Sequence, residues 1–149
     1  MTSLEFREVA HGSPDYRETV LLRERMLRTP LGLTFSAPEL DDEAGDWHLA
    51  GFDTTTGELA ACLVLTPLEG GFVKMRQVAV EPGLQGLGWG RLMVEFSERF
   101  AGKNGYREIV LHARETVVGF YLKLGYAIEG APFVEVTIPH RRMRKRLVI

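Results

Sequence analysis

A run of glycines in the middle of the chain suggests chemistry by its composition and its spacing. Residues 80–96 read VEPGLQGLGWGRLMVEF, with Gly83, Gly86, Gly88 and Gly90 between an apolar strand-like end and a helix-like run. Each glycine weakens a helix by about 1 kcal/mol relative to alanine, so their number needs a reason outside the helix. A helix that begins here leaves its first backbone N–H groups without partners, and such groups bind anions. The spacing therefore predicts a phosphate site.

Two other glycine loops fit this segment poorly. A nucleoside-triphosphate loop ends in Gly-Lys-Ser/Thr, whereas Gly90 is followed here by Arg91 and Leu92. In a dinucleotide fingerprint that starts at Gly86, the third glycine would fall on Arg91, and the acid expected about 20 residues beyond Gly90 would be Val110. A plain surface turn would explain one or two glycines and not the whole run.

Two segments carry a family resemblance. VAVEPGLQGLGWGRLMVEF resembles the acyl-CoA-binding segment of the GCN5-related N-acetyltransferase (GNAT) superfamily, whose loop reads Gln/Arg-x-x-Gly-x-Gly/Ala. The later stretch GFYLKLGYAIEG is similar to the second signature of that superfamily. The resemblance covers roughly residues 47–147. The matching positions are Gln85, Gly88 and Gly90 in the first segment and Tyr121, Gly125 and Tyr126 in the second.

The resemblance implies a fold and an activity. The expected fold is α/β, a mixed and mostly antiparallel sheet of about seven strands flanked by about four helices and splayed at the acyl-CoA site. The expected reaction moves an acetyl group from acetyl-CoA, the cosubstrate, to a primary amine of a small molecule or peptide by direct attack, and no metal is implied. Loop amides would hold the pyrophosphate, and the preceding strand edge would pair with pantetheine. The N–H of Val78 or Ala79 would stabilise the oxyanion. The residues expected to bind the cofactor are Val78, Ala79, Val80, Gln85, Gly86, Leu87, Gly88, Gly90, Arg91 and Arg114.

Proton transfer has one candidate acid and several candidate bases. The resemblance assigns the acid to Tyr121, which would protonate the departing thiolate. Many relatives carry a glutamate on the strand before the loop, but FVKMRQVAV has none. The base could therefore be His112, His140, Glu135 or a chain of water molecules, and we favour His112. Arg114 stands where many relatives have a cofactor-binding asparagine, and it could contact pantetheine or face the acceptor.

Arg23 is the odd member of an otherwise apolar helix stripe. Tyr16, Val20, Arg23 and Leu27 recur at the helical period. Two interpretations stay open. Arg23 could border the acceptor site and pair with a carboxylate of the chain or of the substrate, because a buried arginine is costly without a partner. Alternatively, its stem lies along the core while its head reaches water.

The elements that must position these residues can be read from hydrophobic periodicity and from turn residues. Ser13 and Pro14 are typical of a helix start, and Asn104-Gly105 is typical of a helix end. The pattern predicts strands at 4–9, 47–53, 58–67, 72–80, 107–113, 126–136 and 140–149, and helices at about 14–28, 91–103 and 117–124, with a short helix and an acidic loop in 36–46.

Composition narrows the class of protein. The chain has 149 residues and a net charge of −2, so we expect one domain over residues 1–149 and no general attraction to nucleic acid or membranes. A single cysteine, Cys62, excludes an internal disulfide. Glu5 and Glu8 stand where a signal peptide would have a basic head and an apolar run, and no segment approaches the ~20 apolar residues of a membrane span. These features predict a cytoplasmic protein.

Two other functional classes stay open. The same fold could serve as a non-catalytic acyl-CoA-binding or regulatory module, which the missing strand glutamate would favour. A basic RNA-binding module is the weaker alternative, based on RRMRKR at 141–146. In a strand these residues alternate between faces, with Met143 and Leu147 turned inward, so a solvated final strand is the better interpretation. A homodimer is common in the superfamily and is possible here.

Overall fold

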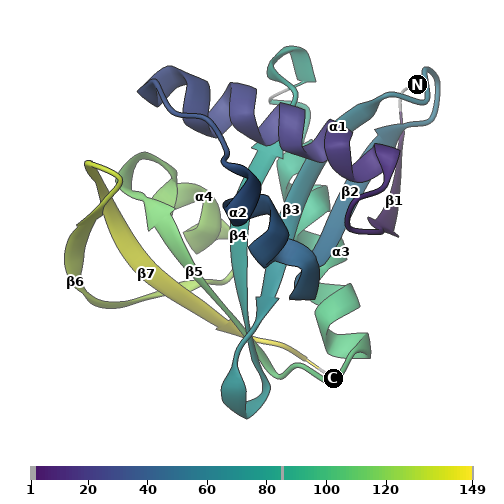
Figure 1. Cartoon of the computed structure of the whole chain (residues 1–149). Helices are drawn as coiled ribbons and strands as arrows, with labels where there is room; N and C mark the ends of the chain where they lie inside the picture. Colours follow the sequence, from purple (N-terminus) through teal and green to yellow (C-terminus); the bar gives the residue numbers. More distant parts are fainter. Residues whose placement is uncertain (1–2, 85, 149) are drawn as a thin grey trace.

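A seven-stranded sheet organises the computed structural model, which describes residues 3–84 and 86–148 (Figure 1). The strand order is β1-β2-β3-β4-β5-β7-β6. Within the described residues, neighbouring strands run antiparallel except for β4 and β5, which are parallel. The predicted mixed, mostly antiparallel sheet is confirmed. The strands are β1 (Leu4–Val9), β2 (Trp47–Asp53), β3 (Leu59–Pro67), β4 (Phe72–Val80), β5 (Glu108–Arg114), β6 (Ala127–Glu135) and β7 (Ile138–Arg146).

Four α-helices and several short helical turns connect the strands. Among the helices, the limits of the first and the third differ most from the expected ones. The first helix is regular only to Arg23 and continues as a π-helical turn to Arg28, and the third helix begins at Trp89 rather than Arg91. The α-helices are α1 (Pro14–Arg23), α2 (Ala37–Asp41), α3 (Trp89–Lys103) and α4 (Val118–Lys123). The short turns are η1 (Glu24–Arg28), η2 (Thr29–Leu31), η3 (Asp42–Gly45), η4 (Glu69–Gly71), η5 (Pro82–Leu84) and η6 (Glu115–Val117).

Local sequence signals explain where α1 and α3 begin and end. The Ser13 side chain accepts a hydrogen bond from the Tyr16 backbone N–H at 3.2 Å, and Pro14 occupies the first helical position. Gly88 precedes α3 with φ of 79°, and Gly105 follows it with φ of 88°. Both values lie in the left-handed region that glycine adopts without strain. The end of α3 was therefore predictable from Asn104-Gly105.

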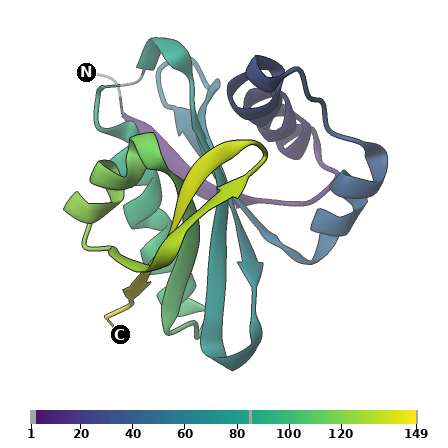
Figure 2. The ribbon, with the colours of Figure 1, turned by 90° about the vertical axis from the view of Figure 1, so that its left-hand side faces the viewer.

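Helices cover both faces of the sheet (Figure 2). We call these the α1/α2 face and the α3/α4 face. The α3/α4 face holds the main apolar core, in which β-strand side chains such as Leu65, Met75 and Leu111 pack against Met93 and Val94 of α3. The α1/α2 face holds smaller apolar groups, one of them Leu22, Cys62 and Ala79. In the described ranges, no helix is long and apolar enough to span a bilayer.

Candidate active site

β4 changes character halfway along its length. Its ladder with β3 shifts between Cys62 and Val64, where Gln77 and Val78 together face one residue of β3. Gln77 has φ of 54°, a value that residues other than glycine seldom adopt. This β-bulge turns Gln77 toward the same face as Arg76, so the alternation of side chains is broken once. No sequence signal marked this position.

The two parallel strands separate next to the bulge. Their paired register ends at Met75 and Leu111. Beyond that point β5 continues beside β7 as far as Arg114, while β4 continues beside β3 as far as Val80. We call this opening the β4–β5 split; it is formed by residues 76–80 of β4 and 112–114 of β5. The splayed sheet predicted from the family resemblance is therefore present.

The glycine loop lies between the end of β4 and the start of α3. Gly86 and Gly88 have φ of 85° and 79°. A Cβ added to Gly86 would meet no heavy atom within 4 Å, so these glycines are required by backbone conformation rather than by space. Leu87 between them is 60% exposed. The space beside Gly86 is thus open, as an anion site needs. Gln85, also expected to bind the cofactor, lies outside the described residues.

Gly90 lies where α3, α4 and β4 meet at the rim of the split. A Cβ on Gly90 would lie 3.6 Å from both Phe120 of α4 and Val80 of β4. Alanine would make ordinary contacts there, and a residue larger than alanine would press against both neighbours. Arg91 next to it is exposed and pairs with Glu95 at 3.2 Å along the same helix. The predicted cofactor residues of the loop and of β4 therefore adjoin, although their role in binding stays a prediction.

Tyr121 lies in the main apolar core. Its side chain is 7% exposed, and its ring centroid is 5.0 Å from that of Phe120 and 5.5 Å from that of Tyr126. Burial raises the pKa of the Tyr121 phenol, so it is protonated at neutral pH. That state suits a proton donor. The packing equally suits a core tyrosine, and its catalytic role stays a prediction.

The three side chains that sequence left as alternative bases form one cluster. His112 Nδ1 lies 3.1 Å from Glu135 Oε1, and His140 Nε2 lies 3.7 Å from Glu135 Oε2. Phe133 packs between the two imidazoles, with its ring 4.9 Å from His112 and 5.9 Å from His140. Burial raises the pKa of Glu135, but its bond to His112 and the nearby positive charges outweigh burial and leave it below its ordinary value. Glu135 is therefore an anion beside His112.

Arg114 points toward η1. Its Nη2 donates to the backbone carbonyl of Leu27 at 3.4 Å. Ala113 packs in the main core, so the side chains of His112 and Arg114 on either side of it turn to the α1/α2 face. Both expectations for Arg114, contact with pantetheine and a position facing the acceptor, stay predictions.

Arg23 is completely buried beneath the split. Its Nη1 and Nη2 donate to the two carboxylate oxygens of Glu43 at 2.8 and 2.9 Å, and Nη1 also donates to Gln77 Oε1 at 2.8 Å. The Tyr16 hydroxyl donates to Glu43 at 2.7 Å. The expectation that the Arg23 head reaches water is wrong, because the residue has 0% exposure. The expected pairing with a carboxylate of the chain is present, so the guanidinium is held by the protein; substrate binding by Arg23 stays a prediction.

Hydrogen bonds and burial set the charge states of the groups in this network. Burial raises the pKa of Glu43, but hydrogen bonds from Arg23 and Tyr16 outweigh it and hold the pKa below its ordinary value. His48 Nε2 donates to the Glu43 backbone carbonyl at 2.8 Å, and burial lowers the pKa of His48. At neutral pH the network therefore holds an ion pair and a neutral imidazole.

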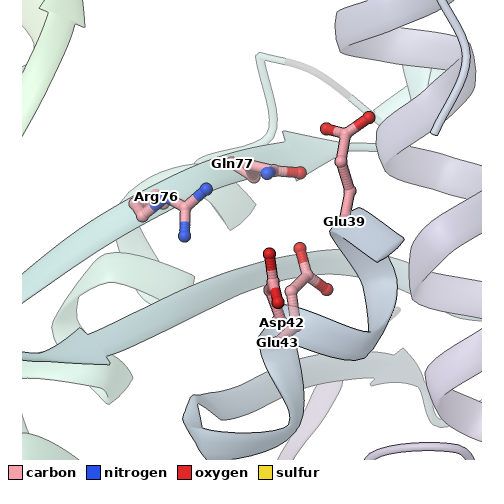
Figure 3. A pocket seen from close by; sticks show the side chains of 5 residues that line it. All are labelled: Glu39, Asp42, Glu43, Arg76 and Gln77. Carbon is pink, nitrogen blue, oxygen red and sulfur yellow. The ribbon is translucent and has the colours of Figure 1, made fainter. Parts of the chain in front are cut away.

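A pocket of about 230 Å³ opens above this network (Figure 3). Two side chains of β4 face three carboxylates from α2 and η3 across it. Sequence analysis missed this pocket, because the acidic stretch SAPELDDEAGD lies far from β4 along the chain and looks like an ordinary solvated loop. The lining residues are Glu39, Asp42, Glu43, Arg76 and Gln77.

Metal chemistry has no evident site in the described part of the chain. In residues 3–84 and 86–148, no group of three histidine, cysteine or acidic side chains is placed to hold a metal ion. The side chains at the split are instead suited to binding anions, moving protons and orienting a small molecule.

Comparisons relate this arrangement to known proteins. The family model described as Acetyltransferase (GNAT) family matches residues 11–126. YyaT, an uncharacterized protein of Bacillus subtilis (strain 168), is 31% identical over 74 residues, which are 50% of this chain and 50% of YyaT. The chain thus matches about half the length of this curated relative.

Solved structures share the whole fold. An acyl-CoA N-acyltransferase from Pseudomonas aeruginosa superposes with a TM-score of 0.81 at 21% identity, covering 96% of this chain and 99% of that one. An aminoglycoside 6'-N-acetyltransferase complexed with coenzyme A gives a TM-score of 0.80 at 18% identity, covering 97% and 98%. At these identities the likeness establishes a shared fold.

Proposed function

Because the chain belongs to the acetyltransferase (GNAT) family, we propose that it transfers an acetyl group from acetyl-CoA to a primary amine by direct attack. The observation that carries this proposal is the β4–β5 split, with a loop of positive-φ glycines at its rim. The Gly86–Gly88 amides and the start of α3 would hold the pyrophosphate, since helix N-termini bind phosphate. The β4 backbone around Val78 and Ala79 would hold the pantetheine arm and polarise the thioester carbonyl.

His112 at the split and Tyr121 in the main apolar core would move the two protons. With its Nδ1 proton donated to Glu135, His112 keeps Nε2 to accept a proton from the attacking amine. The amine nitrogen forms the C–N bond, the C–S bond breaks, and Tyr121 gives its proton to the departing thiolate. Exchange with water restores both groups. These reaction steps do not require a metal ion.

The decisive experiment measures binding and turnover separately. Calorimetry with acetyl-CoA tests the site, and release of the CoA thiol with a panel of primary amines tests transfer, with the acetylated amine identified by mass spectrometry. We expect binding without amine and thiol release only with amine. Binding without release for every amine would favour the non-catalytic acyl-CoA module, and no binding would contradict both functions.

Cys62 provides a control for the direct route. It is buried beneath α1, and burial raises the pKa of its thiol to about 12, so it is a poor nucleophile at neutral pH. The Cys62→Ala variant should therefore transfer acetyl at the wild-type rate. Lost transfer in a folded Cys62→Ala protein would instead indicate an acyl-enzyme route.

A further inference from the structure

The pocket beside the split contains charges that the protein has already paired and charges that it has not. Glu43 is held by Arg23 and Tyr16. Glu39 accepts from Arg28 Nη2 at 2.9 Å and closes the N-terminal capping box of α2. Two of the three pocket carboxylates are thus satisfied by the chain itself, and the third, Asp42, is exposed to solvent.

Arg76 is bound only loosely by comparison. Its Nη1 lies 3.3 Å from Thr66 Oγ1 and 3.9 Å from Asp46 Oδ2, at the outer limit of an ion pair. In the part of the chain that the structure describes, its Nη2 and Nε have no hydrogen-bond partner. The side chain is 37% exposed, and its guanidinium lies beside the pocket opposite α2 and η3 (Figure 3). A guanidinium with free donors in a pocket is suited to a carboxylate, which it can bind with two parallel hydrogen bonds.

The position of Arg76 relates this cation to the reaction. Met75 and Leu111 form the last pair between β4 and β5, so Arg76 and His112 are the first residues beyond it on their two strands. Met75 and Leu111 pack in the core on the α3/α4 face, so Arg76 and His112 both turn to the α1/α2 face. Neighbouring strands lie about 5 Å apart and diverge from here. A small molecule bound to Arg76 therefore reaches His112 across the base of the split.

The remaining charges on this face favour the same ligand. Lys74 lies two residues before Arg76 in β4 and is half-buried. It interacts electrostatically with Glu135, Arg76 and Arg142. Within the described residues it forms no ion pair, so Lys74 and Arg76 place two positive charges on this stretch of β4, near the carboxylates of Glu135 and Asp46. A substrate carboxylate would be attracted to these two cations.

We infer that the acceptor is a small amino acid whose carboxylate binds Arg76 while its amine lies toward His112 in the β4–β5 split. This inference rests on the proposed acetyl transfer and specifies its acceptor class. The pocket volume of about 230 Å³ is below the ~300–1,000 Å³ typical of drug-sized ligands. It therefore fits a compact acceptor rather than an aminoglycoside or a folded peptide.

Matched pairs of acceptors test the inference on the full chain. Each pair differs by one carboxylate: L-alanine and ethylamine, L-leucine and isoamylamine, L-phenylalanine and phenethylamine. We expect kcat/KM for acetyl transfer to be roughly 10- to 100-fold higher for the amino acid, the range of a charge-assisted pair. Arg76→Gln should reduce this ratio to about one by raising KM for the amino acids. Arg7→Gln, which removes an exposed cation paired with Glu5 on β1, away from the split, should keep the ratio.

The outcomes separate the inference from the proposed function. Equal or better transfer to the simple amines, or to a polyamine such as spermidine, would overturn the inference and leave the transferase function intact. Absence of transfer to any amine would contradict the function. In that case calorimetric titration of L-leucine into the CoA-bound protein still decides the site: binding that Arg76→Gln abolishes supports it, and binding unchanged by Arg76→Gln, or no binding, overturns it.

Discussion

The two faces of the sheet bury side chains of different kinds. The α3/α4 face is filled by aliphatic and aromatic side chains around Met93 and Leu111. The α1/α2 face buries Arg23, Glu43 and His48, each less than 5% exposed. Apolar packing is non-directional and stabilises whichever residues fit. Buried hydrogen bonds are directional, so the polar face can fix the orientation of Gln77 and of the pocket walls, at the risk of a large loss when one partner is removed.

We expect the largest effect when the buried Arg23–Glu43 pair of the α1/α2 face is broken. Arg23→Met leaves the buried Glu43 carboxylate without its partner, and we expect a loss of about 3–5 kcal/mol in the free energy of unfolding. Urea denaturation measures it. Arg25→Met is the matched control, because the exposed Arg25–Glu81 pair should contribute less than ~1 kcal/mol. Equal losses in the two variants would contradict the difference between the faces.

On the α3/α4 face, the test removes the Tyr121 hydroxyl, which apolar packing does not need. Tyr121→Phe keeps the ring in the core and removes the proposed proton donor, so we expect kcat to fall roughly 10- to 10⁴-fold with acetyl-CoA binding and melting temperature nearly unchanged. Tyr106→Phe is the control: it loses a hydrogen bond from Trp47 at 3.0 Å and should change stability rather than kcat. Wild-type turnover in Tyr121→Phe would leave Tyr121 as core packing and move the search for the acid to water or His112.

The glycine loop, our proposed phosphate site, should respond to a change in backbone conformation. Gly88→Val places a β-branched side chain at φ of 79°, which costs on the order of 1–3 kcal/mol, and adds bulk to the proposed phosphate site. We expect the Kd for CoA to rise at least about tenfold by calorimetry. Gly102→Val, at an ordinary φ with space around its Cβ, is the control within α3 and should bind CoA normally. Unchanged affinity in a folded Gly88→Val protein would refute the assignment of the loop.

Lowering the pH should reduce the free energy of unfolding by a smaller amount, through the buried polar groups of the α1/α2 face. Burial lowers the folded-state pKa of His48, so its contribution to stability is full above the unfolded value of about 6.5 and declines as the pH falls below it. The lowered pKa of Glu43 adds a second loss at lower pH. Burial raises the pKa of Asp46, which acts in the opposite direction. In His48→Gln, an amide donor that does not titrate, the decline in urea stability between about pH 6.5 and 5 should disappear; a wild-type stability that is flat over this interval would contradict the assignment.

Local signals predicted the framework and the loop. Periodicity located the seven strands and the main helices, and the glycines marked the start of α3 to within two residues, because these features depend on residues that are neighbours in the sequence. The His112–Glu135 contact could not be predicted, since β7 lies between β5 and β6 and the pairing depends on strand order. Gln77 gave no signal either, because glutamine is not a residue that favours φ of 54°. Arg23, which donates to Gln77, and Glu43, which binds Arg23, come from other parts of the chain.

The bulge at Gln77 also determines which face of the sheet each later side chain of β4 points to. With one residue inserted, Val78 and Val80 pack toward α3 and Ala79 toward α1. Deleting a single residue at this point would exchange these roles, because side chains alternate along a strand. Two valines would then meet α1, and one alanine would be left against the main core. The extra residue thus keeps the large side chains on the thick apolar face while its neighbour Arg76 stays at the pocket, so the length of β4 is constrained as strictly as its composition.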